Sequence, residues 1–176
     1  MSLLLCKMNS PSEQFSLIYD QYVEKIYRFV YLKVNSQEIA QDITSKVFLN
    51  GWGSYQKGPE NIKNTGAFLY QIARNMVTDH YREKSKTKMV STDFIGQIAD
   101  NRTNLHERAV LGSDVEMVRS AMQNLKKGYQ DVLIWYYLED MPIEEICGIL
   151  NKSNGAVRIM IHRGLNALKG ELREQV

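Results

Sequence analysis

The sequence of 176 residues has few cysteines, few prolines and no large excess of charge of either sign. Its two cysteines, Cys6 and Cys147, lie far apart without C-x-x-C spacing, which argues against a disulfide framework and against a cysteine zinc site. The three histidines are equally scattered, so we expect no metal ligation and no cofactor. A reducing compartment, the cytoplasm, is the simplest location for such a chain.

Long hydrophobic runs and the motifs of common enzymes are also missing. The apolar start MSLLLCKMN is too short for a signal peptide or a membrane span, so we expect no membrane insertion. The sequence has no Ser/His/Asp set, P-loop, dinucleotide motif or metal-ligand cluster, which argues against an enzyme. The net charge of +2 does not by itself indicate a nucleic-acid partner, so the distribution of the charges has to decide.

What is present favours helices. Hydrophobic residues make up 44% of the chain and only 3 residues are proline, while Leu, Ile, Lys, Glu and Gln are frequent. Apolar residues recur at helical spacing in two long segments, and the stretch between them is polar with short apolar islands. We therefore predict an all-α fold of two small helical domains, at 10–84 and 114–176, joined by a linker at 85–113.

The N-terminal domain is predicted to contain three helices. The first, SPSEQFSLIYDQYVEKIYRFVYLKV, has Ser10 as its cap and Pro11 at its first position. The second, SQEIAQDITSKVFLNGW, follows a capping pattern that starts at Asn35, and a glycine-rich loop separates it from a third helix that begins near Ala67. One face of the third helix is polar and partly basic, and it carries Gln71, Arg74, Asn75, Thr78 and Arg82.

The C-terminal domain has the plan of a helix-turn-helix. A break at Pro142 precedes a short apolar helix, and the turn NKSNG follows, in which Ser153 or Asn154 can cap a second amphipathic helix. Residues 158–170 contain three Lys/Arg and no Asp/Glu. A cationic outer face of this kind suits DNA phosphates and guanine edges, and an ordinary solvated helix face is the alternative.

Taken together, these motifs resemble the extracytoplasmic-function (ECF) group of bacterial RNA polymerase sigma factors. The segment EEICGILNKSNGAVRIMIHRGLNALK is similar to the promoter-binding C-terminal part of that group. In order, YDQYVEKIYRFVY, IAQDITSKVFLNGW and GAFLYQIARNMVTDHYR resemble the helices of its N-terminal module, so the likeness extends from Phe15 to Leu172. It implies a non-catalytic protein that binds core RNA polymerase, directs it to promoters, contacts duplex and melted promoter DNA, and has an anti-sigma factor as a further partner.

The resemblance also implies three binding sites. Docking on core polymerase falls on Asp42, Ser45, Lys46 and Leu49. Melting and recognition of the minus-ten element fall on the third helix, at Gln71, Arg74, Asn75, Thr78 and Arg82, with the loop 54–66 taking up an extruded base. Recognition of the minus-thirty-five element falls on Ser153, Asn154, Arg158, Ile159, His162 and Arg163.

Three residues depart from the pattern of the family. Lys46 stands where an acidic residue is common, so this lysine lies at the rim of the interface, or polymerase presents a different surface, or docking is weak. Met160 replaces a common arginine. Ile159 lies on the groove side, where an apolar side chain can touch a thymine methyl but cannot hydrogen-bond a base edge, so we expect a thymine opposite it.

Two other functions remain open on the sequence. One is a stand-alone helix-turn-helix transcriptional regulator, and the other is a sigma-like protein that sequesters a regulator without initiating transcription. Structural roles are expected for several further side chains: Trp135, Tyr136 and Tyr137 pack inside the C-terminal domain, Asp79 orients a neighbouring arginine or caps the fold, and Cys147 is a buried thiol. Nothing in the pattern predicts contacts between the two domains.

Overall fold

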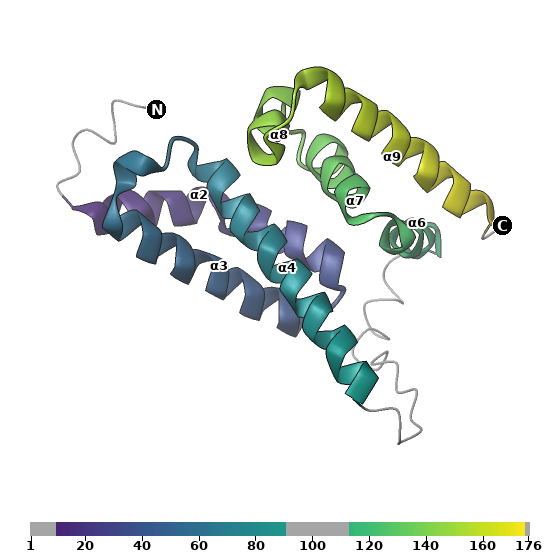
Figure 1. Cartoon of the computed structure of the whole chain (residues 1–176), viewed down its shortest axis with the longest axis horizontal. Helices are drawn as coiled ribbons and strands as arrows, with labels where there is room; N and C mark the ends of the chain where they lie inside the picture. The colour runs from purple at the N-terminus through teal and green to yellow at the C-terminus, as the bar shows by residue number, and fades with distance from the viewer. Residues whose placement is uncertain (1–9, 91–112, 175–176) are drawn as a thin grey trace.

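The computed structural model describes residues 10–90 and 113–174, and every regular element within these two segments is helical. In chain order the elements are α2 (Pro11–Val34), α3 (Gln37–Lys57), the 3-10 turn η1 (Pro59–Asn61), α4 (Thr65–Val90), α6 (Ser113–Asn124), α7 (Lys127–Leu133), the π-helical turn η2 (Ile134–Leu138), α8 (Ile143–Leu150) and α9 (Asn154–Glu174). Figure 1 shows α2 to α4 as one group and α6 to α9 as a second group beside it. The predicted all-α fold with two helical regions is confirmed, while residues 91–112 of the predicted linker lie outside the described residues.

Local capping signals set the start of α2 and the corner that follows it. The hydroxyl of Ser10 accepts the N–H of the third residue of α2 at 3.3 Å, as predicted, and Pro11 occupies the first position, where no N–H is needed. Asn35 does not cap α3 as the sequence led us to expect, because it ends α2 in a left-handed conformation with φ of 54°. Ser36 caps α3 instead, and its hydroxyl accepts a backbone N–H at 3.4 Å.

The predicted loop at 54–66 is shorter in the structure because helices extend into it from both sides. Tyr55 packs on Phe15 with ring centroids 5.5 Å apart, which holds the last turn of α3 in place. At the other side, the side-chain oxygen of Asn64 accepts a backbone N–H of α4 at 2.9 Å and caps that helix before its predicted start. α4 then continues to Val90, so the first residues of the predicted linker are helical.

The N-terminal module buries the apolar stripes that the helical spacing predicts. Its three long helices pack around a core that includes Phe15, Ile18, Ile26, Phe29, Ile43, Val47, Leu69 and Ala73. Ile72 and Met76 of α4 are half-buried at the edge of this core. This edge of α4 is therefore available to line a surface groove.

The C-terminal module contains the predicted helix-turn-helix, formed by α8, a turn and α9. Pro142 precedes α8, and Asn151 ends it with φ of 51°. The hydroxyl of Ser153 accepts a backbone N–H of α9 at 3.3 Å and caps that helix. Val157 and Ile161 are buried on the inner face, so the opposite face of α9 points to solvent.

The π-helical turn η2 directs one aromatic side chain out of its own module. Trp135 is fully buried, whereas Tyr136 and Tyr137 are 37% and 50% exposed, so the expectation that all three pack inside the C-terminal domain is wrong. Trp135 stacks on Phe29 of α2, with centroids 5.4 Å apart and ring planes at 11°, and meets Tyr70 of α4 edge-on. The backbone N–H of Glu139 donates to the carbonyl of Ile134, an i→i+5 bond. In this π-helical register the side chain of Trp135 points inward while those of Tyr136 and Tyr137 point outward.

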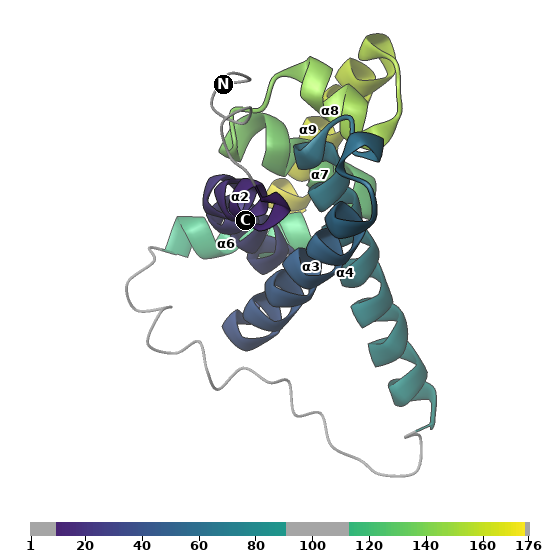
Figure 2. The same ribbon diagram turned by 90° about the vertical axis from the view of Figure 1, so that its left-hand side faces the viewer.

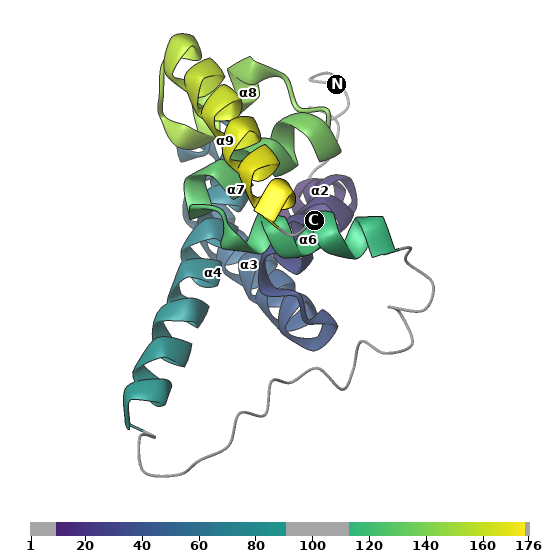
Figure 3. The same cartoon turned by 90° about the vertical axis from the view of Figure 1, so that its right-hand side faces the viewer.

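The two modules therefore pack against each other. Figures 2 and 3 show the C-terminal module lying across one side of α2 and α4, and α3 lies on the side of the N-terminal module away from this contact. We call the contact of α2 and α4 with α7, η2 and α8 the seam. Figure 1 shows α9 on the far side of α7 from α4, so the seam leaves α9 on the outside of the molecule.

Candidate functional site

The predicted minus-ten residues form one stripe on α4, and the seam covers one edge of it. The side-chain amide of Gln71 donates to the backbone carbonyl of Ile149 on α8 at 3.2 Å. The Nε of Arg74 donates to a carboxylate oxygen of Asp131 on α7 at 2.8 Å. Two of the five predicted residues are thus engaged by the C-terminal module.

The rest of the stripe lies away from these contacts. Asn75 and Arg82 are exposed and Thr78 is half-buried. Arg82 Nη1 lies 3.1 Å from an oxygen of Asp79, so the expectation that Asp79 orients a neighbouring arginine is confirmed. The structure therefore places the five residues along one side of the helix but divides them between two surroundings.

A groove of about 530 Å³ runs between α3 and α4. Its lining has an apolar part from α4 and a polar part from both helices, and consists of Leu49, Asn50, Gly53, Ser54, Lys57, Phe68, Ile72, Asn75, Met76 and Asp79. The sequence analysis placed Ser54 and Lys57 in the loop 54–66 for an extruded base, but it missed Asn50 and Gly53 of α3. The signal was present, because Asn50, Ser54 and Lys57 recur at helical spacing on an exposed face.

A carboxylate buried in the seam is shared by two cations. The side chain of Asp131 is 2% exposed, and its oxygens pair with the ammonium of Lys33 and with the Nε of Arg74. Burial lowers the pKa of Lys33 although the charge of Asp131 opposes the shift. The loss of hydration of the lysine therefore outweighs the attraction of its partner.

A second buried carboxylate reinforces the same contact. Arg28 of α2 holds Glu139 with both ends of its guanidinium, Nε to Oε1 at 2.5 Å and Nη2 to Oε2 at 2.9 Å. The hydrogen bond to Glu139 raises the pKa of Arg28, whose side chain is half-exposed. In the ion pairs that cross the seam between described residues, the cations come from the N-terminal module and the carboxylates from the C-terminal module.

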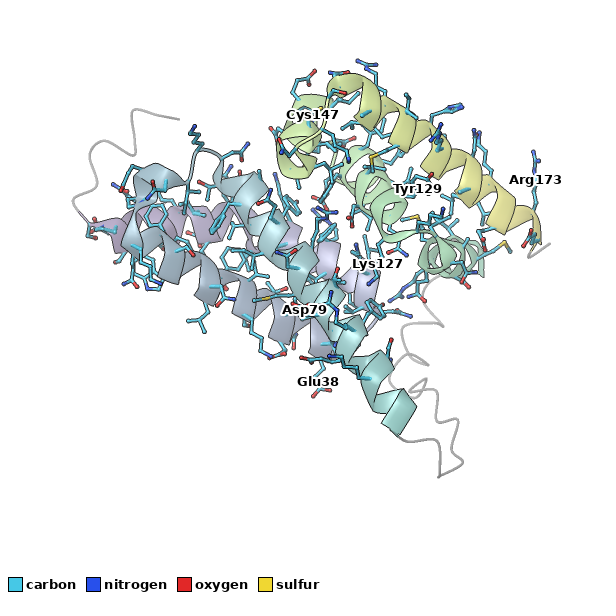
Figure 4. All side chains as sticks on the ribbon, in the orientation of Figure 1. Glu38, Asp79, Lys127, Tyr129, Cys147 and Arg173 are labelled. Carbon is cyan, nitrogen blue, oxygen red and sulfur yellow. The ribbon has the colours of Figure 1, made fainter. Side chains whose placement is uncertain are left out.

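Some buried polar groups make the seam less stable. The hydroxyl of Tyr70 and the indole N–H of Trp135 are buried and have no hydrogen-bond partner among the described residues. Burial, followed by the charge of Glu139, raises the pKa of Tyr70, so its hydroxyl stays neutral. Each unpaired polar group of this kind costs about 1–3 kcal/mol. On the same side, Figure 4 shows Lys127 between α7 and α4, where its ammonium lies 5.1 Å from the ring centre of Tyr81.

The four residues predicted to dock on polymerase are all exposed on α3. Leu49 is 69% exposed. The ammonium of Lys46 lies 2.7 Å from a carboxylate oxygen of Asp42 one turn earlier, and the hydroxyl of Ser45 donates to a backbone carbonyl. The charge of the unusual Lys46 is therefore balanced within the same helix.

A hollow of about 340 Å³ between α2 and α3 adjoins this face and shares Ser45 with it. The hollow is lined by Tyr19, Val23, Glu24, Tyr27, Gln41, Thr44 and Ser45. The sequence reading missed it, although apolar positions on α2 extend beyond the stripe that faces the core. Leu17 and Tyr19, for example, are 43% and 44% exposed.

The predicted minus-thirty-five residues lie together on the outer face of α9 and the turn before it. All six are exposed: Ser153, Asn154, Arg158, Ile159, His162 and Arg163. The amide nitrogen of Asn154 donates to Glu144 of α8 at 3.3 Å, and its oxygen accepts the Nε of Arg158 at 2.7 Å. The guanidinium of Arg158 is therefore oriented before any ligand binds.

Within residues 10–90 and 113–174, no group of three or more His, Cys, Asp or Glu side chains could hold a metal ion. Nor does any helix in this part of the chain have the length and apolar character needed to span a membrane. Cys147 carries a free thiol that is half-buried, not buried as expected, and Figure 4 shows it on α8. Cys6 lies outside the described residues.

Comparison with known proteins identifies both modules. The Sigma-70 region 2 family matches residues 18–87, and the Sigma-70 region 4 family matches residues 115–168. The ECF RNA polymerase sigma factor SigW of Bacillus subtilis is 28% identical over 172 residues, which cover 92% of this chain and 90% of SigW. The chain belongs to the ECF group of sigma factors.

Other relatives agree. The ECF sigma factor BldN of Streptomyces coelicolor is 27% identical over 162 residues, covering 89% of this chain but only 60% of the length of BldN. The sigma factor RpoE of Bartonella quintana, solved with the anti-sigma factor NepR, has the same fold, with a TM-score of 0.69 and 18% identity over 92% of this chain and 98% of that one. This sigma factor directs transcription initiation, and its two modules correspond to the two matched regions.

The seam geometry makes one prediction about stability. Asp131→Asn leaves the buried Lys33 without a countercharge, which costs about 3–5 kcal/mol in a chain that stays closed. Separation of the modules hydrates the lysine and relieves this cost, so we expect the radius of gyration in small-angle X-ray scattering to rise by about 2 Å or more. The matched control is Asp79→Asn, which breaks a solvent-exposed pair with Arg82 and should change nothing. An unchanged radius for Asp131→Asn would show that this carboxylate does not hold the seam.

Proposed function

We propose that this sigma factor uses three surfaces in initiation, of which the first two adjoin each other at Leu49. The exposed face of α3 docks on core polymerase, the stripe of α4 with the α3–α4 groove reads the melted minus-ten element, and the outer face of α9 reads the minus-thirty-five element. One observation carries the proposal: each module exposes a helix face with arginine and amide groups, and each module matches a different sigma region. Polymerase would hold the two modules at a fixed separation, so that two weak DNA contacts combine through effective concentration.

The groove between α3 and α4 fits an extruded base. Phe68, Ile72 and Met76 offer apolar contact to its flat face, and the amide of Asn75 can donate to and accept from its edge. Lys57 at the same groove supplies a positive charge for the backbone. These contacts replace part of the stacking that the base loses when it leaves the duplex.

The face of α9 fits the major groove of duplex DNA. In a helix-turn-helix the second helix enters the groove by its N-terminal part, which here carries Arg158, Ile159 and His162. The contact between Asn154 and Arg158 fixes the arginine for a bidentate contact with guanine or a phosphate. Ile159, 52% exposed beside them, can touch a thymine methyl.

Docking on polymerase would use Leu49 as an apolar anchor, with the α2–α3 hollow beside it as a pocket for a side chain of the partner. Because Lys46 is paired with Asp42, polymerase meets a dipolar pair and not an isolated positive charge. We further propose that an anti-sigma factor controls this protein, as one accompanies the RpoE structure. Its place of work would be the cytoplasm, and it would have no catalytic role and need no cofactor.

Run-off transcription with purified core polymerase on a randomised promoter library tests this function. The full chain should select promoters with two conserved elements at a constant spacing, and the chain without polymerase should protect neither in a footprint. A footprint by the chain alone would support a stand-alone regulator. Binding to core polymerase without any transcript would support a sequestering protein.

The docking anchor gives a direct prediction. Leu49→Ala should weaken binding to core polymerase by about tenfold, because truncating a central apolar contact removes more than 1 kcal/mol of binding free energy. The measurement is fluorescence anisotropy with labelled sigma factor. Leu17→Ala is the matched control, since Leu17 is exposed on α2 outside the proposed face. Equal losses for the two variants would remove Leu49 from the interface.

Ile159 gives a prediction about sequence preference. In the same library, Ile159→Ser should lose preference for thymine at a single position of the minus-thirty-five element, by about fivefold or more, because the methyl contact is gone. Leu138→Ser, an equally exposed apolar residue outside α9, should leave the selected sequence unchanged. An unaltered preference at every position in Ile159→Ser would contradict the assignment.

A further inference from the structure

A cavity of about 380 Å³ lies where α2, α4, α6 and α7 meet, and none of its lining residues belongs to the three proposed surfaces. Two ammonium groups, three side-chain amides, one phenol ring and one leucine line it: Lys33, Tyr81, Gln123, Asn124, Leu125, Lys127 and Gln130. No carboxylate is among these described lining residues. The volume is at the small end of the range of small-molecule sites, so the cavity has room for a compact polar ligand.

The charges around the cavity are not balanced. Lys33 pairs with Asp131, but Arg74 shares the same carboxylate, so these three groups together keep one positive charge in excess. Lys127 adds a second, because it forms no ion pair with a described residue. Burial lowers the pKa of Lys33, and the charges of Arg74 and Lys127 act in the same direction. An anion between the ammonium groups of Lys33 and Lys127 would relieve this repulsion.

The walls of the cavity are held in place before any ligand binds. The hydroxyl of Tyr81 donates to the backbone carbonyl of Lys33, and the ammonium of Lys127 lies 5.1 Å from the centre of the same ring. Figure 4 shows Lys127 between α7 and α4. The amide nitrogen of Gln130 donates to three backbone carbonyls within residues 122–125, at 2.9, 3.2 and 3.1 Å, and ties the corner between α6 and α7. A site built in advance loses little conformational entropy on binding.

We propose that this cavity binds a small phosphate monoester of about the size of a mononucleotide. The phosphate would lie between the ammonium groups of Lys33 and Lys127. An ammonium has three donors, of which Asp131 takes one from Lys33. The amide of Gln123 would donate to the phosphate as well, whereas the amide nitrogen of Asn124 already donates to Glu171 at 3.0 Å.

The two ammonium groups favour a doubly charged phosphate. A phosphate monoester carries a charge of about −1.5 to −2 at pH 7, whereas each phosphodiester of DNA carries one negative charge. A free monoester therefore matches Lys33 and Lys127 better than the DNA backbone does. Its contacts would come from helices of both modules, so binding would stabilise the arrangement in which these helices pack.

Isothermal titration calorimetry of the full chain with AMP tests the site, and it needs neither polymerase nor promoter. AMP should bind with one-to-one stoichiometry and a dissociation constant below about 1 mM. Cyclic 3′,5′-AMP has the same base and sugar but a singly charged diester, so it should bind about tenfold more weakly or worse. Absence of saturable AMP binding would overturn the proposal, and equal affinities for the two nucleotides would overturn the choice of a doubly charged phosphate.

Substitution of one lysine locates the site. Lys127→Gln should weaken AMP binding by about tenfold or more, because a charge-assisted contact to the phosphate is lost. Lys126→Gln is the matched control, since Lys126 is exposed one residue earlier, carries the same charge and does not line the cavity. It should leave the affinity within about twofold of wild type. Equal losses in the two variants would place the phosphate elsewhere and contradict the proposal.

A competition experiment separates a free monoester from DNA as the source of the phosphate. A single-stranded oligonucleotide without terminal phosphates offers only diesters, so it should not displace AMP from the wild-type chain. Displacement that disappears in Lys127→Gln would show that the cavity takes the DNA backbone, and it would overturn the assignment to a small molecule.

Discussion

The carboxylate of Asp131 sets the arrangement of the two modules. It comes from α7, yet both of its partners, Lys33 and Arg74, belong to the N-terminal module. A buried carboxylate without these cations would be strongly unfavourable, so α7 has to lie where α2 and α4 bring them together. The position of α7 in turn fixes η2 and α8 against α4, and through α8 the orientation of α9 on the outside.

A purely apolar contact of the same area would hold the two modules together more strongly. Ion pairs lose much of their value when they are taken out of water, and the lowered pKa of Lys33 records that loss. In exchange, the charged groups of the seam are stable in water once the modules separate. The stack of Trp135 on Phe29 belongs to an apolar core that continues across both modules and includes Ile134, Ile146 and Ile149. The buried hydroxyl of Tyr70 and the indole N–H of Trp135 within it are polar groups that water can satisfy on opening.

Local features of this fold could be predicted from sequence, and the seam could not. Ser10 and Ser153 cap helices because a hydroxyl reaches an N–H three residues on, which is visible within one turn of sequence. Lys33 and Asp131 are 98 residues apart, and a buried charge leaves no periodic signal. The sequence predicts that Trp135 is buried, but it does not predict against which module. The π-helical register of η2 directs the side chain toward Phe29 of the N-terminal module. The α3–α4 groove could be predicted in part, because the polar face of α4 and the segment 54–66 were both assigned to melted DNA. The contribution of Asn50 depends on how the two helices pack.

The closed arrangement also constrains how polymerase could act. The proposed docking face on α3 is exposed with the seam closed and would stay exposed after opening, so docking there would bind both states equally well. A ligand with equal affinity for two states shifts nothing between them, however tightly it binds. Opening therefore has to be driven by contacts that only separated modules can make. Such contacts arise when the C-terminal module meets a second surface of the polymerase, or duplex DNA, at a distance that the closed chain cannot span.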